Sequence, residues 1–306
     1  MIEFRADLTG WTGARPRGIY FLTATGAALI WTHADDRWVI SVPGPVADPA
    51  TTVRAVLGLP DLRLDVLAGA PWTAAAQSAA RYAHGPVFLA GDAAHRFPPA
   101  GATGVSAAMH DAHNLAWKIA AVVHGHAGAG LLDSYAAERE PVGRRNAEET
   151  GAAWSRLLTG DGAPFSGRSL AQLDMGHQYR SPIVAGDGGP DADPPGADYR
   201  QTAAPGCRAP HLWLADGTST VDLFDRTFVL LTAGPGGAWR DAAAHCPAVP
   251  VACHVLTEPG WPDLYGVAPD GAVLVRPDGH VAWRSRTASG APATDLKATL
   301  TTCTGG

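Results

Sequence analysis

Residues 87–95 read VFLAGDAAH and residues 98–104 read PPAGATG, and the rest of the chain is organised around these two stretches. The apolar run Val87–Ala90 predicts a buried strand that ends in the acidic turn Gly91-Asp92, and a proline- and glycine-rich loop follows. A parallel strand leading through a loop into a helix N-terminus is a common ligand site. Free backbone N–H groups and the positive end of the helix dipole meet there.

A long helix is predicted behind the loop, from about Ser106 to Val123. Apolar residues three and four positions apart form one stripe along it, and we expect this stripe to face the core. Its members are Ala108, Ala112, Leu115, Ile119 and Val122.

The turn and the loop carry groups that suit a flat, hydroxylated ligand. The Asp92 carboxylate can accept two hydrogen bonds from neighbouring hydroxyls, as on a ribose or ribityl chain. Gly101 and Gly104 let the backbone approach a flat ring closely. The amides of Gly104, Val105 and Ser106 favour negative charge on a ligand carbonyl, by about 0.3–1 kcal/mol when exposed and up to about 2 kcal/mol when partly buried. That biases the redox state of a flavin but does not bind one alone.

Composition and charge exclude several classes of function. The chain has 306 residues, a net charge of -6 and no basic block, so a nucleic-acid-binding role has no electrostatic basis. No apolar stretch is long enough to span a bilayer, and residues 1–10 do not read as a signal peptide, so we expect a cytoplasmic protein. The 4 cysteines form no C-x-x-C pair and are expected to be reduced.

Three histidines raise the question of a metal site. His110 and His113 lie three residues apart on the predicted helix, and His95 precedes them. A metal centre would need a third ligand and an open coordination position, and a structural or solvent-facing histidine is the commoner case, so we predict no metal site. If no flavin is bound, His95, Arg96, Asp92 and His110 become the candidates for acid–base catalysis in the cleft.

The residues before this centre predict a small sheet. Runs rich in β-branched and aromatic residues at 18–23, 27–33 and 37–42 predict an antiparallel meander. A helix is predicted over Ala50–Leu57, and another strand over residues 62–67.

A second long helix is predicted after the first, from about Leu131 to Glu149, with a break or kink at Pro141. We expect its charged side chains to form a solvated outer face. They are Asp133, Glu138, Arg139, Glu140, Arg144 and Arg145.

The C-terminal third predicts a separate domain. Turn residues at 186–195 and a boundary near Pro205 divide the chain into residues 1–204 and 205–306. The later part reads strand, helix, strand and then a hairpin, which is typical of a thioredoxin-like unit. Its strands are predicted at residues 227–232, 249–256, 272–276 and 280–284, and its helix at residues 238–244.

Several stretches together resemble the class A FAD-dependent aromatic hydroxylases, which have the para-hydroxybenzoate hydroxylase fold. They are residues 85–95, 98–104 and 111–118, which resemble the second flavin-binding motif, residues 132–142, and the tail stretches 205–214 and 273–284. The tail is similar to that of the bacterial polyketide hydroxylases. The resemblance implies an α/β fold: an incomplete FAD- and substrate-binding domain with an antiparallel sheet and long helices, followed by a thioredoxin-like domain.

The resemblance also implies roles for individual residues. Gly91 and Asp92 hold the ribose or ribityl hydroxyls of FAD, and Pro99 lies beside the isoalloxazine, near the substrate pocket. Backbone groups at the helix start contact the pyrimidine edge of the flavin; they belong to Gly101, Gly104, Val105 and Ser106. The family often has Asn where Ser106 stands, so a side-chain amide contact is lost while the backbone contact remains. Arg96 and Phe97 face the ring or the substrate.

The implied activity is FAD-dependent hydroxylation of an aromatic polyketide, with NADPH as the transient co-substrate that reduces the flavin. The family binds the ADP half of FAD with a Gly-x-Gly-x-x-Gly turn, and this pattern does not occur in the 306 residues. Residues 234–237 follow a predicted strand, but Trp239 stands where the last glycine should be. The tail also has no C-x-x-C, so a packing or dimerisation role is expected for it.

Three explanations remain open at this point. The chain is a fragment of a longer hydroxylase, or a second chain or homodimer covers the open edge of the central sheet, or the chain is a relative that has lost FAD. In the last case the scaffold acts as a polyketide cyclase, isomerase or dehydratase. A non-catalytic partner that binds a ligand or a subunit is a further alternative. Flavin absorbance of the purified protein separates these hypotheses.

Overall fold

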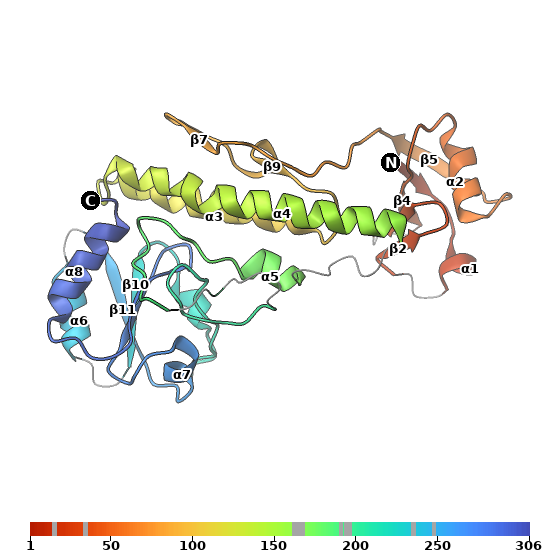
Figure 1. Ribbon diagram of the computed structural model, residues 1–306. Helices are drawn as coiled ribbons and strands as arrows, with labels where there is room; N and C mark the ends of the chain where they lie inside the picture. The colour runs from red at the N-terminus through yellow and green to blue at the C-terminus, as the bar shows by residue number, and fades with distance from the viewer. Residues whose placement is uncertain are drawn as a thin grey trace. The chain divides into compact units, whose positions relative to one another are not determined.

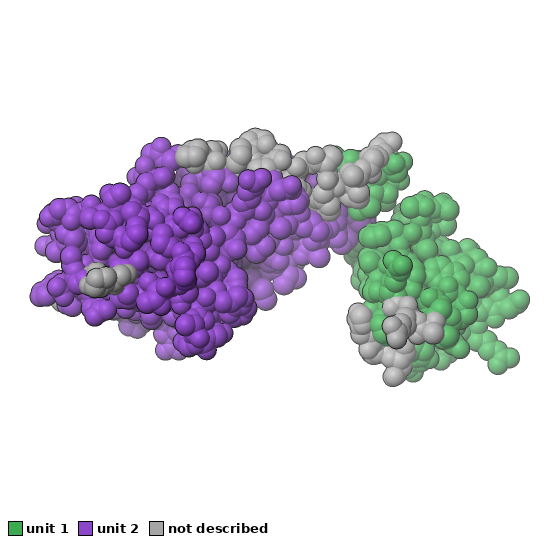
Figure 2. Space-filling view, turned by 90° about the horizontal axis from the view of Figure 1, so that it is seen from below, with its two compact units in different colours: residues 1–74, 155–162 green, residues 75–154, 163–306 purple. Residues whose placement is uncertain are grey.

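The structure is a computed structural model that describes residues 1–13, 17–32, 36–160, 169–189, 192, 198–233, 237–246 and 249–306 (Figure 1). The chain divides into two compact units, residues 1–74 with 155–162 and residues 75–154 with 163–306 (Figure 2). The domain boundary predicted near Pro205 falls inside the second unit and stays a prediction. Parts of the predicted turns at 186–195 and 234–237 lie outside the described residues.

The first unit contains an antiparallel sheet of five described strands, in the order β2-β3-β4-β1-β5. Neighbours β2, β3 and β4 pair consecutively, which confirms the predicted meander. The core lies between this sheet and helix α2, and includes Phe4, Leu29, Ile40 and Val53. The elements are β1 (Ile2–Arg5), α1 (Thr9–Thr12), β2 (Ile19–Leu22), β3 (Ala27–Trp31), β4 (Arg37–Ser41), α2 (Pro49–Leu57) and β5 (Asp65–Gly69).

The residues at both ends of helix α2 explain why its bounds could be predicted from the sequence. Asp48 caps its N-terminus by accepting a hydrogen bond from the backbone N–H of Thr51 at 2.9 Å, and Pro49 occupies the first turn. Gly58 ends the helix in the left-handed conformation with φ 68°.

The second unit is built around two long helices that run side by side (Figure 1). Helix α3 spans Thr103–Val123, and helix α4 spans Asp133–Thr159, whose last turn counts with the first unit. Short strands precede them and form two antiparallel pairs, β6 with β9 and β7 with β8. These smaller elements are β6 (Gln77–Ser78), β7 (Ala83–His84), β8 (Val87–Phe88), η1 (Gly91–Ala93), β9 (His95–Arg96), η2 (Ala129–Leu132) and α5 (Leu170–Met175).

The prediction of a buried parallel strand over Val87–Ala90 is wrong. Strand β8 comprises only Val87–Phe88, and among the described strands it pairs only with β7, antiparallel. The Val87 side chain is 59% exposed. An apolar run predicts burial only if a neighbouring layer covers it, and the described residues supply no parallel partner.

The predicted buried stripe of α3 is also wrong, because the helix is turned the other way. Ala112 is exposed and Ile119 is 40% exposed, while Ala108, Leu115 and Val122 are only partly buried. The buried face is mainly polar and consists of Thr103, Ala107, Asp111, Asn114, Trp117 and Lys118. Periodicity located the helix but not the face that meets the core.

The tail of the second unit is a four-stranded mixed sheet in the order β11-β10-β12-β13, in which β10 and β11 are parallel and the other pairs are antiparallel. This is the arrangement expected of a thioredoxin-like unit. Helices α6 and α8 cover one face and α7 covers the other. The elements are η3 (Thr220–Leu223), β10 (Phe228–Ala233), α6 (Gly237–Ala244), β11 (Val251–Leu256), α7 (Trp261–Tyr265), β12 (Ala272–Val275), β13 (Val281–Ser285) and α8 (Pro292–Cys303).

Candidate functional site

The turn at Gly91 lies directly against helix α3. Gly91 has φ 59°, and a Cβ atom added to it would lie 3.3 Å from the Cβ of Ala108. Glycine is therefore required twice at this position, for its backbone conformation and for the close approach of the turn to the helix. The neighbouring Asp92 is exposed, so its carboxylate is available to a ligand.

Asp111 on α3 holds this turn in place through a hydrogen bond to its backbone. Its buried carboxylate accepts a hydrogen bond from the Gly91 N–H at 3.0 Å and another from Arg139 Nε at 2.7 Å, and it is hydrogen-bonded to His95 Nε2 at 2.8 Å. Burial alone raises the pKa of Asp111, but the bond with His95 and the charge of Arg139 outweigh it and hold the pKa below its usual value. The carboxylate therefore stays charged and locks turn, strand β9 and both long helices together.

Arg139 extends this cluster. Its Nη1 donates to the Tyr179 hydroxyl at 3.0 Å, and its Nη2 donates to the Ala107 carbonyl at 3.2 Å. The prediction that Glu138 and Arg139 face solvent is wrong, because both side chains are buried between α3 and α4. Asp133 and Arg144 are exposed as predicted, and Glu140 and Arg145 are half-buried.

The loop before α3 leaves the helix start open to a ligand. Ala102, the residue before the helix, adopts φ 56°, a left-handed conformation that is strained for alanine, and Gly101 has φ 86°. No side chain among the described residues caps the helix N-terminus. No side chain therefore accepts hydrogen bonds from the N–H groups of the first turn. These N–H groups can donate to an electron-rich carbonyl edge of a ligand.

The other predicted flavin contacts surround this helix start. Pro99 is exposed, Gly101 and Gly104 are half-buried, and Val105 is 68% exposed. Burial raises the pKa of Asp174 on α5, and its interaction with the Ser106 side chain opposes that shift.

The candidates for acid–base catalysis differ in their exposure and in their partners. His95 is 2% exposed, is bound to Asp111, and stacks on Phe97 with ring centroids 4.6 Å apart. Arg96 is exposed and donates to Gln77 at 2.6 Å. His110 lies instead in a second group of rings, 5.5 Å from the His177 ring. Their catalytic assignment stays a prediction.

The second group of rings is buried between α3, the segment after α5 and the tail. The His177 ring lies 5.4 Å from His280 and 4.9 Å from Tyr179. Neither nitrogen of His177 has a hydrogen-bond partner among the described residues. Burial and the charge of Arg139 lower the pKa of His110 to about 3 and that of His177 well below its ordinary value.

A buried ion network joins the two helices to the tail. Glu138 accepts hydrogen bonds from Lys118 at 2.8 Å, from Asn114 at 2.7 Å and from Arg276 at 2.7 and 3.0 Å. Arg276 also pairs with Asp278. Burial alone raises the pKa of Glu138, but the charges of Arg276 and Lys118 lower it to about 2. Burial lowers the pKa of Lys118 to about 8, so both charges persist at neutral pH.

Local sequence patterns did not identify Asp111, Arg139 or the members of this network as residues that hold the candidate site in place. Asp111 and Lys118 lie within the 111–118 stretch that carries the family resemblance, and Glu138 and Arg139 lie within the 132–142 stretch. Their place within these two stretches was the only feature of the sequence that pointed to them. Charge patterning on the helix predicted the opposite, namely a solvated face.

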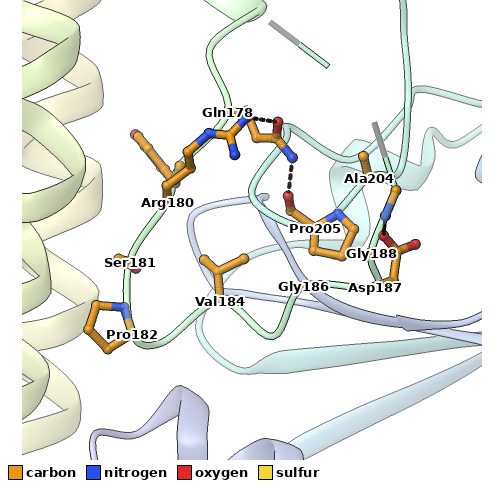
Figure 3. Close-up of a pocket in the computed structure, with 12 residues that line it drawn as sticks. Gln178, Arg180, Ser181, Pro182, Val184, Gly186, Asp187, Gly188, Ala204 and Pro205 are labelled. Atoms are coloured by element: carbon orange, nitrogen blue, oxygen red, sulfur yellow. Dashed lines mark hydrogen bonds between the residues drawn. The ribbon is translucent and has the colours of Figure 1, made fainter. Parts of the chain in front are cut away.

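A pocket of about 550 Å³ lies elsewhere in the second unit (Figure 3). Its lining includes Gln178, Arg180, Asp187 and Pro205, and Gln178 donates to the Pro205 carbonyl at 2.7 Å. Asp187 is held by Arg284 and Arg286. None of the residues predicted to hold a flavin lines this pocket. The candidate flavin site is therefore at the Gly91 turn.

Two family models match the chain. One, described as an FAD binding domain, matches residues 12–150, and the other, described as the C-terminal part of aromatic-ring hydroxylases, matches residues 202–306. The tetracenomycin B2 monooxygenase-dioxygenase of Streptomyces olivaceus is 45% identical over 92% of this chain and 56% of its own length. The tetracenomycin A2 monooxygenase-dioxygenase of Streptomyces glaucescens is 40% identical over 84% of this chain and 50% of its own length. The chain thus spans about half the length of these relatives.

Solved structures show the same fold. One match is to a ternary complex of aklavinone-11 hydroxylase with FAD and aklavinone, with a TM-score of 0.83 and 31% identity. The match covers 99% of this chain and 62% of the hydroxylase chain. RebC with bound 7-carboxy-K252c has a TM-score of 0.86 and 31% identity, and covers 99% of this chain and 62% of that chain. No helix in the described ranges is long and apolar enough to cross a membrane.

Proposed function

The chain belongs to the FAD-dependent aromatic-ring hydroxylase family, and from this premise we propose that it provides the flavin- and substrate-facing part of an aromatic polyketide monooxygenase. The observation that carries the proposal is the Gly91-Asp92 turn locked by Asp111 against the uncapped start of α3. The exposed Asp92 carboxylate can accept hydrogen bonds from a ribityl chain, and the amides at the start of α3 can donate hydrogen bonds to a polar ring edge.

The chain's own residues divide the work of binding. The exposed Asp92 carboxylate accepts hydrogen bonds from ribose or ribityl hydroxyls, and the Gly91 turn that carries it cannot shift while Asp111 holds its amide. The amides of Gly104, Val105 and Ser106 donate to the pyrimidine edge. Pro99 lies beside the ring system. When bound, FAD supplies the redox chemistry, taking electrons from NADPH and using molecular oxygen to hydroxylate the substrate.

The proposed substrate is an aromatic polyketide. This rests on the names of the relatives, two of which act on tetracenomycins, and on the complex of aklavinone-11 hydroxylase with aklavinone. In this chain, Phe97 and Pro99 follow the turn in the sequence, and the Phe97 ring stacks on His95. The alternative of a flavin-free cyclase needs an acid and a base at one cleft, and His95 is buried and hydrogen-bonded to Asp111.

The test is FAD binding by the purified chain, alone and co-expressed with the part of the Streptomyces olivaceus relative that it does not match. Flavin absorbance and fluorescence quenching report the affinity. Asp92→Ala is expected to weaken FAD binding about tenfold or more, because hydrogen bonds to a charged group contribute about 1.5–3 kcal/mol.

Asp225→Ala is the matched control, since the Asp225 side chain is 75% exposed on the tail and pairs only with the exposed Arg226 among the described residues. It should leave FAD binding unchanged. Protein that stays colourless in both preparations contradicts the proposal, and so does an Asp92→Ala variant with the affinity of the unaltered chain.

A further inference from the structure

Arg208, at the start of the tail, is a half-buried cation without a counter-ion. Its guanidinium has no hydrogen-bond or ion-pair partner among the described residues. Two buried arginines of the tail are paired instead. Arg276 is bound to Glu138. Arg284 is bound to Asp187. A guanidinium keeps its charge and carries five N–H donors, so partial burial without an acceptor is unfavourable. Arg208 therefore suits an anionic ligand.

The backbone fixes the direction in which the Arg208 side chain extends. Arg208 lies directly opposite His280 in an antiparallel bridge. The residues next to them make the two flanking backbone hydrogen bonds, at 2.9 and 2.8 Å, so the pair itself is not hydrogen-bonded. In such a pair the Cα atoms are about 4.5 Å apart and the two side chains project to the same side. The guanidinium of Arg208 therefore extends on the side of the His280 ring.

Further polar groups without partners lie on this side. The His177 ring lies 5.4 Å from that of His280 and is 2% exposed, and neither of its nitrogens is hydrogen-bonded among the described residues. His110 is half-buried, with its ring 5.5 Å from that of His177. Burial raises the pKa of Tyr199, and the charge of Arg208 opposes that shift, which places these two side chains near each other. The Tyr199 hydroxyl has no partner in the described part of the chain.

The charge around these groups is positive. Burial and the charges of Arg139 and Arg208 lower the pKa of His110 to about 3. The charge of Arg139 is balanced by its ion pair with Asp111. No carboxylate of the described residues is hydrogen-bonded to Arg208, His110 or His177. The charge of Arg208 is therefore left uncompensated beside a set of N–H and O–H donors.

We propose that Arg208, Tyr199, His110 and His177 form a binding site for a small oxyanion, namely a phosphate or carboxylate group. The planar guanidinium of Arg208 donates to two oxygens at once and supplies the charge. The Tyr199 hydroxyl and the single N–H of each neutral imidazole donate to the remaining oxygen lone pairs. None of the four residues is assigned to the flavin, so this site does not depend on the proposed function.

The test is calorimetric titration of the full chain at about pH 7.5, without FAD, with inorganic phosphate and separately with acetate at constant ionic strength. We expect saturable binding of at least one anion with a Kd of about 1 mM or lower. Tighter binding of phosphate indicates a ligand that carries a phosphate group, and tighter binding of acetate one that carries a carboxylate. Arg208→Met is expected to weaken binding about tenfold or more, because it removes charge-assisted hydrogen bonds. Tyr199→Phe is expected to weaken it about two- to tenfold, because it removes one neutral donor.

Arg226→Met is the matched control, because it removes the same charge from a side chain of the tail that is 89% exposed. It should leave the affinity unchanged. Circular dichroism and urea unfolding report whether Arg208→Met is folded, and Tyr199→Phe, which loses only a hydroxyl, decides the test if it is not. The proposal is overturned if neither anion binds with saturation, if the folded variants of Arg208 and Tyr199 bind like the unaltered chain, or if Arg226→Met weakens binding as much as they do.

Discussion

His177 shows at the scale of one residue how burial alone sets a chemical state. Its ring is 2% exposed and packs against Tyr179 and His280, with no hydrogen-bond partner for either nitrogen among the described residues. A proton on this ring would be a buried charge close to Arg139 and Arg145. The fold therefore accepts only the neutral imidazole.

Acid is accordingly expected to destabilise the protein below about pH 6.5, the ordinary pKa of histidine. The folded-state pKa values of His177 and His110 are lowered, so the unfolded chain binds more protons, and the stability present above this pH is lost as the pH falls. Each buried histidine contributes a slope of up to about 1.4 kcal/mol per pH unit. Arg139, Arg145 and Arg208 oppose protonation of the two rings, while Asp278 favours it at the neighbouring His280.

Urea unfolding at about pH 7.5 and pH 5 measures this loss of unfolding free energy. His177→Phe, which keeps a ring and cannot be protonated, should reduce the difference between the two pH values. His84→Phe serves as the control, since His84 is exposed. An unchanged slope in His177→Phe would show that other groups govern the acid response.

The same scale marks a limit of reasoning from sequence. The turn at Gly91-Asp92 was predictable, because a turn depends on local backbone geometry, while the flavin-binding roles of its two residues stay a prediction. Asp111 was not, because its carboxylate matters through Gly91, His95 and Arg139, which come from three other segments. Long-range hydrogen bonds leave no local pattern.

Helix α3 shows at the scale of one element that a period gives a helix but not its orientation. The bounds Thr103–Val123 lie close to the predicted 106–123, yet the face predicted as core lies partly in solvent. The buried face carries Asp111, Asn114 and Lys118, whose hydrogen-bond and ion-pair partners lie on other segments of the chain. A charged residue on a helix predicts exposure only when no partner lies across the interface.

Helix α4 offers a test of packing in the second unit. A Cβ added to Gly143 would lie 1.8 Å from the Tyr82 hydroxyl, and Tyr82 is fully buried. Gly143→Ala gains about 1 kcal/mol of helix propensity but forces Tyr82 to move, at a typical cost of about 1–3 kcal/mol. We expect net destabilisation in urea unfolding, together with changed tyrosine fluorescence.

Gly237→Ala is the comparison for Gly143→Ala. Gly237 begins α6 and has nothing within 4 Å of an added Cβ, so this variant should be neutral or slightly stabilising. If Gly143→Ala proves as stable as Gly237→Ala, the close packing of Tyr82 on α4 does not hold.

At the scale of the whole molecule, the buried ion network binds the thioredoxin-like tail to the helix pair. Arg276 and Asp278 belong to the tail, Glu138 to α4, and Lys118 to α3. The apolar core continues across the same contact, since Trp117 of α3 and Leu131 pack with the residues under α6 and α8. The tail is therefore a structural part of the second unit, held by charges as well as by apolar contacts.

Removing one member of this network should be costly. Arg276→Met leaves Glu138 and Asp278 buried without their shared cation, and breaking a buried pair in this way costs about 3–5 kcal/mol. Glu138→Gln in the same chain should recover part of the loss, which a double-mutant cycle by urea unfolding detects. Arg226→Met, at a side chain 89% exposed, should change stability by less than about 0.5 kcal/mol. Additive effects of Arg276→Met and Glu138→Gln would contradict the network.

The meander, the two long helices and the strands of the tail were predictable, because they depend on local patterns, whereas strand β1 and helices α7 and α8 were not predicted. The pairing of the strand predicted over Val87–Ala90 was not predictable, since it depends on a neighbour that the described residues do not contain. The association of the tail with the helix pair was also beyond local patterns. It rests on side chains more than 130 positions apart, as in the Arg276–Glu138 pair with a separation of 138.

The network has a consequence for recombination between family members. A chimera that joins the first part of this chain to the tail of another family member near residue 205 separates Arg276 and Asp278 from Glu138, Lys118 and Asn114. A hybrid whose new tail lacks the counterparts of Arg276 and Asp278 buries Glu138 without its partners from the tail. A tail can therefore be exchanged without loss of stability only if it supplies residues that pair with Glu138, Lys118 and Asn114.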